Sequence, residues 1–200
     1  MTSDPRLSGR VNLARATILL IDDNPQALDI LSSIAQGFGV HEQIRCASAI
    51  EASEIIKTRS VDLIIVDCAM PEMDGYDFVQ WLRRETPEPI CLTPVIMLTG
   101  HAASSKVQKS RDCGASFVVT KPLTPAVLLQ RILWLANEKR DFVKAETYVG
   151  PDRRVRSFGP PLGMPGRRAG DLSTHVGEAS EANMDQSDID SLIKPRRVAL

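Results

Sequence analysis

The chain has 200 residues, of which 43% are hydrophobic and 24% are charged, a balance typical of soluble globular proteins. Its 24 Lys and Arg nearly match its 25 Asp and Glu, which argues against a nucleic-acid binder, because such proteins carry a basic excess. No apolar run reaches the roughly 20 residues that cross a membrane, and the first ten residues lack the apolar core of a signal peptide. The 4 cysteines stand far apart, so we expect reduced thiols in a cytoplasmic protein that binds neither nucleic acid nor membrane.

Short apolar runs alternate with helical patterns through most of the chain. Strands are predicted where residues are continuously apolar, and helices where apolar residues recur every three or four positions. Three helix starts carry capping signals: Asn24 before Pro25, Ser48 with Glu51, and Thr124 before a proline. The predicted strands are 17–21, 43–46, 63–66, 94–98 and 117–119, and the predicted helices are 25–38, 48–56, 78–82, 104–113 and 124–135.

This order of elements is five repeats of a strand followed by a helix. Strands that are apolar throughout, with helices between them, are typical of a parallel sheet that is covered on both faces. The sequence therefore predicts an α/β fold with a five-stranded, parallel, doubly wound sheet. The flavodoxin-like strand order 2-1-3-4-5 suits five strands.

The composition changes near Phe142, and helical or strand periodicity is lost beyond it. Residues 150–170 are rich in Gly, Pro and Arg, and residues 171–190 are acidic. Charge blocks in a segment poor in apolar residues predict disorder. We therefore expect a flexible N-terminus over 1–15, one folded domain over 16–142, and a disordered tail over 143–200 with a short helix at 185–193.

Polar side chains follow four of the predicted strands. Asp22 and Asp23 follow the first strand, Asp67 the third, Thr99 the fourth and Lys121 the fifth. Because the carboxyl ends of parallel strands share one edge of the sheet, these residues should converge near the point where strand order reverses. Carboxylates for a divalent cation such as Mg²⁺, a hydroxyl and a lysine together predict a phosphoryl-transfer site. The alternative, that each residue only caps a helix or lies in a solvated loop, does not account for four strand ends in this order.

The chain resembles the receiver domain of bacterial two-component response regulators over residues 16–136. The matching strings are ILLIDDN at 18–24, DCAMPEMDG at 67–75, VIMLTG at 95–100 and the pair Lys121-Pro122. The resemblance implies a phosphorelay protein of the single-domain, chemotaxis-regulator-like kind. Its cognate phosphodonor would be a sensor histidine kinase or a phosphotransfer protein.

The resemblance also assigns roles to the residues at the strand ends. Asp67 would accept the phosphoryl group, Thr99 would move to the phosphoryl oxygens, and Lys121 would pair with them. The peptide bond between Lys121 and Pro122 would be cis. Mg²⁺ would be held by the side chains of Asp22, Asp23 and Asp67 and by the backbone carbonyl of Ala69.

Two features depart from the family pattern or leave a role open. The position three residues before Lys121, which relatives fill with a switch Tyr or Phe, holds Val118. Phe117 lies one residue earlier and should point to the other side of the strand. Ala69 and His101 occupy positions that modulate loss of the phosphoryl group in the family, although a loop histidine is more often a bystander.

The sequence after the domain shows no periodic helices that could form a DNA-binding output module. Residues 184–193 resemble the flagellar switch peptide that chemotaxis receivers bind, with matches at Gln186, Ile189, Asp190 and Leu192. We therefore expect this segment to dock on a receiver domain, its own or another, or to serve a flagellar or chemotaxis partner. A homodimer through the helices at 104–113 and 124–135, the latter carrying Trp134, is a second expectation.

Three functions remain in competition. The first is a response regulator that signals by protein–protein contacts and is not an enzyme acting on an external substrate. The second is a phosphate sink that drains a kinase and has no downstream target. The third, a phosphatase with an aspartyl-phosphate intermediate, requires a DxD motif that Asp22-Asp23-Asn24 does not provide.

Overall fold

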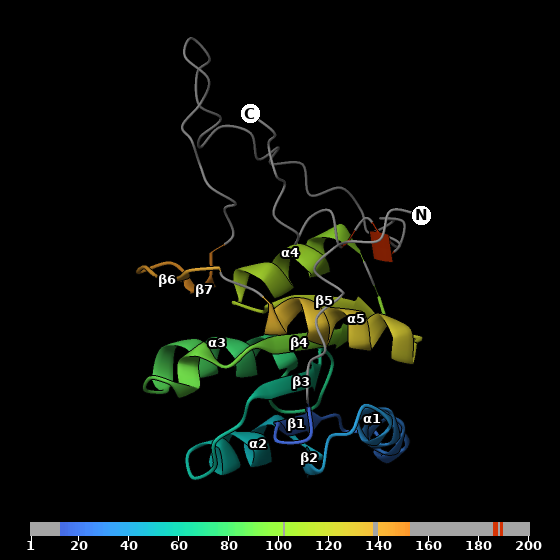
Figure 1. Cartoon of the computed structure of the whole chain (residues 1–200). Coiled ribbons are helices and arrows are strands. Elements are labelled where there is room, and N and C mark those ends of the chain that lie inside the picture. Colours follow the sequence, from blue (N-terminus) through green and yellow to red (C-terminus); the bar gives the residue numbers. More distant parts are fainter. Residues whose placement is uncertain (1–12, 102, 138–139, 153–185, 188, 190–200) are drawn as a thin grey trace.

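The computed structural model describes residues 13–101, 103–137, 140–152, 186, 187 and 189. The main sheet consists of β1 (Thr17–Ile21), β2 (Glu42–Cys46), β3 (Leu63–Asp67), β4 (Val95–Thr99) and β5 (Phe117–Thr120). All neighbouring strands are parallel and follow the order β2-β1-β3-β4-β5, which confirms the predicted fold (Figure 1).

Five α-helices connect and cover these strands. They are α1 (Pro25–Gly37), α2 (Ala49–Ile56), α3 (Gly75–Glu85), α4 (Ser104–Asp112) and α5 (Pro125–Ala136), and a 3₁₀ turn, η2 (Ile90–Leu92), precedes β4. One buried cluster packs α1 and α5 on the sheet, and a second packs α2 and α3 on the other face. Because both faces are covered, the strands must be apolar throughout, and β3 and β4 are buried at every position.

The predicted helix caps form hydrogen bonds. Asn24 accepts from the amide of Gln26 at 2.9 Å, and Ser48 accepts from the amide of Glu51 at 3.1 Å. The Glu51 carboxylate in turn accepts from the amide of Ala47 at 3.0 Å, which completes the capping box one residue earlier than its usual partner.

The ordered domain extends beyond both predicted limits. Leu13 is buried within the core, so the described chain packs from before residue 16. After the predicted end at 142, strands β6 (Phe142–Lys144) and β7 (Val149–Pro151) pair as an antiparallel hairpin. The prediction of disorder from residue 143 is therefore wrong over the hairpin. Periodicity missed it because three-residue strands are too short to show a pattern.

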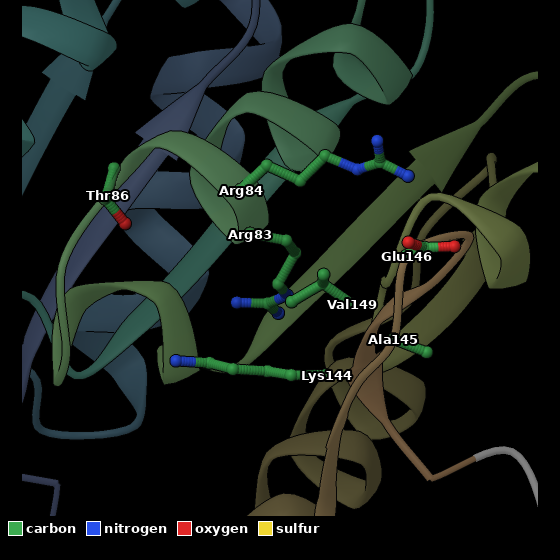
Figure 2. A pocket seen from close by; sticks show the side chains of 7 residues that line it. All are labelled: Arg83, Arg84, Thr86, Lys144, Ala145, Glu146 and Val149. Atoms are coloured by element: carbon green, nitrogen blue, oxygen red, sulfur yellow. The ribbon is translucent and has the colours of Figure 1, made fainter.

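The hairpin packs against the C-terminal part of α3, where it helps to line an open pocket of about 460 Å³. Figure 2 shows the Arg83 side chain reaching from α3 toward Val149 of the hairpin. The hairpin sits tightly, because a Cβ on Gly114 would lie 2.5 Å from the carbonyl oxygen of Val149. Tyr148 is buried and donates a hydrogen bond to the carbonyl of Pro151 at 2.7 Å.

The rest of the predicted tail is described at three positions only. Gln186, Ser187 and Ile189 have helical conformation, and the other residues of the expected helix at 185–193 lie outside the described part. Residues 1–12 and 153–185 also lie outside it. Within the described part, no helix is long and apolar enough to cross a membrane.

Candidate phosphoacceptor site

The predicted site residues meet at the carboxyl edge of the sheet, near the junction of β1 and β3. Asp22 directly follows β1, and Asp67 is the last residue of β3, which pairs with β1. Thr99 ends β4 and lies opposite Thr120, the last residue of β5. The strand order reverses between β1 and β3, which is where doubly wound sheets place their ligands.

Lys121 joins the two central carboxylates. Its Nζ lies 2.6 Å from Oδ1 of Asp67 and 2.8 Å from Oδ2 of Asp22. The Asp22 and Asp67 side chains are only 2% and 9% exposed, so the ammonium is the charge that makes their burial tolerable. The peptide bond from Lys121 to Pro122 is cis, as the resemblance implied.

The ionisation of Lys121 reflects these contacts. Burial opposes its positive charge, but the hydrogen bonds and charges of Asp22 and Asp67 outweigh burial and raise the pKa of the ammonium above 10.5. Asp23 also lies at this edge, where its side chain is exposed. Carboxylates placed this close repel one another unless a positive group lies between them, so this edge favours a cation.

Backbone contacts hold Asp67 in place. Its second oxygen, Oδ2, accepts from the amide of Ala69 at 2.6 Å. A Cβ on Gly75 would lie 2.2 Å from the backbone carbonyl oxygen of Asp67, so the first residue of α3 must be glycine for the helix to approach so closely. Sequence reasoning assigned no role to Gly75, although its position directly after the Asp74 N-cap marks the start of α3.

Thr99 points its hydroxyl into the loop after β4. The hydroxyl donates to the backbone carbonyl of His101 at 2.8 Å and accepts from the His101 amide at 3.2 Å. The side chain is buried, so this pair of bonds replaces water. His101 thus contacts the site residue Thr99 through its backbone, while its residue surface is exposed.

The predicted metal ligands are brought together only in part. Asp22 and Asp67 share Lys121, whereas Asp23 and Ala69 are exposed beside them. Among the residues that the structure describes, no three His, Cys, Asp or Glu side chains form a cluster with metal-site geometry.

The two positions flagged on β5 are both buried. Phe117 packs edge-to-face on Trp134 of α5, with ring centroids 4.6 Å apart, so Trp134 belongs to the core of this chain. Val118 is 1% exposed and belongs to the same cluster. Phe117 is thus committed to packing and does not replace the missing switch aromatic.

Comparisons with known proteins agree with this geometry. Residues 18–133 match the response regulator receiver domain family. The chain is 30% identical over 135 residues to the transcriptional regulatory protein YvrH of Bacillus subtilis, covering 68% of this chain and 54% of that protein. The chain spans about half the length or less of the curated relatives it first matches.

Two solved structures share the fold. The chemotaxis protein CheY4 of Vibrio cholerae is 31% identical, with a TM-score of 0.54 over 58% of this chain and 95% of that one. The receiver domain of the histidine kinase CKI1 of Arabidopsis thaliana, solved with Mg²⁺, is 25% identical, with a TM-score of 0.52 over 59% of this chain and 91% of that one. Because the family match covers more than half of the chain, the chain belongs to the response regulator receiver domain family, a class of phosphorelay signalling modules.

Proposed function

We propose that this chain is a response regulator that accepts a phosphoryl group on Asp67 from a histidine kinase or phosphotransfer protein. One observation carries the proposal. At the edge of the sheet where such folds bind ligands, a single lysine contacts both a buried strand-end aspartate and its neighbour, at 2.6 and 2.8 Å. A carboxylate held in this way is fixed in position and adjacent to a cation that can pair with added negative charge.

The roles follow from the contacts. An Asp67 carboxylate oxygen attacks the phosphorus of a phosphohistidine, the P–N bond breaks, and the histidine nitrogen leaves with the bonding electron pair. Lys121 stays beside the acceptor and pairs with the phosphoryl oxygens, whose charge of about −1.5 to −2 replaces the single charge of the attacking carboxylate. Thr99 then exchanges its bonds with His101 for a bond to a phosphoryl oxygen, which repositions the loop after β4.

Magnesium suits the donor set at this edge. Asp22 and Asp67 already share one cation, the Lys121 ammonium, and carboxylate oxygens are donors that Mg²⁺ prefers. In the proposal Mg²⁺ is held by the side chains of Asp22, Asp23 and Asp67 and by the backbone carbonyl of Ala69. When bound, it supplies positive charge that offsets the charge of the transferring phosphoryl group.

We expect the phosphorylated chain to signal in the cytoplasm by protein–protein contacts and not by catalysis on an external substrate. Phosphorylation changes the charge beside β4 and β5, so the surface built from α4, β5 and α5 is the natural place for a readout. Similarity to a chemotaxis protein makes a flagellar or chemotaxis partner one candidate for that contact.

The test is the intact mass of the full chain after incubation with Mg²⁺ and acetyl phosphate. Wild type should gain one phosphoryl group, and Asp67→Asn should gain none. Asp77→Asn is the matched control, because Asp77 is exposed on α3 and should leave uptake unchanged. Uptake by Asp67→Asn equal to that of wild type would refute the assignment of the acceptor.

A further inference from the structure

The segment around Gln186 contacts the receiver at the strand that leads into the phosphoacceptor site. The Gln186 side-chain oxygen accepts from the backbone amide of Thr120 at 3.0 Å and from its hydroxyl at 3.1 Å. The side-chain nitrogen donates to the backbone carbonyl of Val118 at 3.2 Å. One amide side chain therefore satisfies three polar groups of β5 at once.

Those groups lie on the outer side of β5, the last strand of the sheet. Among the described strands β5 pairs with β4 alone, so within this part of the chain the outward N–H of Thr120 and C=O of Val118 face no partner strand. These are the two groups with which a residue of a further parallel strand would bond. The primary amide of Gln186 offers the same donor and acceptor pair, so it covers the edge as a strand residue would.

Burial of Ile189 adds an apolar contact to this polar one. Ile189 is 0% exposed and belongs to the buried cluster that includes Val107 of α4, Val118 of β5 and Ile132 of α5. The polar contacts of Gln186 thus fall on β5, and the buried cluster that Ile189 joins includes residues of the neighbouring helices α4 and α5. Figure 1 shows the segment in red near the end of β5, well away from the β6–β7 hairpin.

We propose that Gln186 and Ile189 anchor an intramolecular ligand of this receiver, and that phosphorylation of Asp67 releases it. The connection allows docking within one chain, since the 33 residues from 153 to 185 can span up to roughly 110 Å. A domain of this size has a radius of gyration of only about 14 Å. While docked, the segment denies the α4–β5–α5 surface to any external partner.

The second part of the proposal, release of the segment on phosphorylation, rests on the proposed function. Thr120 stands between Val118 and Lys121 along the chain, and the Lys121 amide donates to the carbonyl of Thr99 at 2.8 Å. A phosphoryl group that repositions Thr99 and the Lys121 side chain therefore acts on the backbone to which Gln186 is bonded. The segment is docked while Thr99 bonds to His101. A shift to the state in which Thr99 bonds to a phosphoryl oxygen therefore weakens docking. Because the coupling is reciprocal, docking in turn opposes phosphorylation.

Docking is tested on the unmodified full chain by amide hydrogen exchange at Thr120, measured by NMR. Gln186→Ala and Ile189→Asp should each accelerate exchange of the Thr120 amide by about tenfold, the scale expected for losing its hydrogen bond. Gln36→Ala, at an exposed glutamine of α1, is the control and should change nothing. Unaltered exchange in both variants would overturn the proposal, and protection that fell on dilution would assign the contact to a second copy of the chain.

Release is tested on the same sample with Mg²⁺ and acetyl phosphate, with phosphorylation followed by intact mass. The Thr120 amide should exchange faster in the phosphorylated chain, and Gln186→Ala should take up the phosphoryl group faster than wild type. Phosphorylation with unchanged exchange would overturn release while leaving the proposed function intact. Absence of any adduct would refute the proposed function, while the exchange data on the unmodified chain would still decide docking.

Discussion

The two edges of the central sheet both bury charged side chains, but they satisfy them in different ways. At the carboxyl edge, Asp22 and Asp67 are balanced by Lys121. At the amino edge, Arg83 is 2% exposed and donates to three backbone carbonyls, those of Gly114, Cys91 and Thr93, at 3.0, 2.6 and 2.8 Å.

The difference assigns a responsive role to the contacts of Lys121 and a structural role to those of Arg83. Ion pairs between side chains can rearrange when a new charge arrives, so the carboxyl edge can respond to a phosphoryl group. Backbone carbonyls are fixed by the fold, so Arg83 holds α3 against the segments before β4 and β5. The guanidinium carbon of Arg83 also lies 5.4 Å from the ring centroid of Phe142. Burial also lowers the pKa of Arg83 to about 10, yet leaves it charged at neutral pH.

The largest expected effect is on stability, at the amino edge. Arg83→Met removes the donors to three carbonyls and should lower the free energy of unfolding by about 3 kcal/mol. Arg84→Met is the control, because Arg84 is the exposed neighbour on the same helix. Urea denaturation measures the difference. Phosphoryl uptake by the folded fraction should stay that of wild type, and selective loss of uptake without loss of stability would contradict the division between the edges.

A smaller effect, shared between stability and uptake, is expected at the carboxyl edge. Gly75→Ala places a methyl group against the Asp67 carbonyl, so α3 or the end of β3 must shift, at about 1–3 kcal/mol. Gly37→Ala is the control, since a Cβ there meets nothing within 4 Å. We expect slower phosphoryl uptake only for Gly75→Ala, by intact mass over time. Equal uptake by the two variants would show that the position of Asp67 tolerates displacement.

The sequence predicted the carboxyl edge better than the amino edge, for a physical reason. Asp22, Asp67, Thr99 and Lys121 each follow an apolar strand, and parallel strands must bring their ends together. The amino edge depends on Arg83, whose burial leaves no trace in the helical pattern of α3, and on strands of three residues. Close approaches such as that of Gly75 depend on helix placement to within an ångström, which periodicity does not encode.

The bonds of Thr99 and Gln186 mark a second limit of sequence reasoning. The pattern placed Thr99 at the site but could not give the direction of its hydroxyl, which depends on the backbone of the following loop. The sequence match at Gln186 and Ile189 indicated a docking segment but not the surface on which it docks. That surface depends on which outer strand lacks a partner strand among the described residues, a property of the assembled sheet.

The smallest expected effect is a pH dependence that isolates the ion pairs of Lys121. Because its folded pKa is raised above 10.5, Lys121 contributes stability that is fully present below pH 10.5 and is lost as pH rises through the folded value. The free energy of unfolding should therefore fall more steeply above pH 10.5 for wild type than for Lys121→Met. Urea titrations across the alkaline range measure both slopes.

Buried thiols weaken the fold in the same range, which makes the comparison of two proteins necessary. Burial raises the pKa of Cys46 and of Cys113 to about 12, so their unfolded forms ionise first and stability falls above pH 9.0. That loss is common to wild type and Lys121→Met and cancels in the difference between their slopes. Equal slopes would mean that the lysine gains nothing from Asp22 and Asp67, and the carboxyl edge would then be no more responsive to charge than the edge held by Arg83.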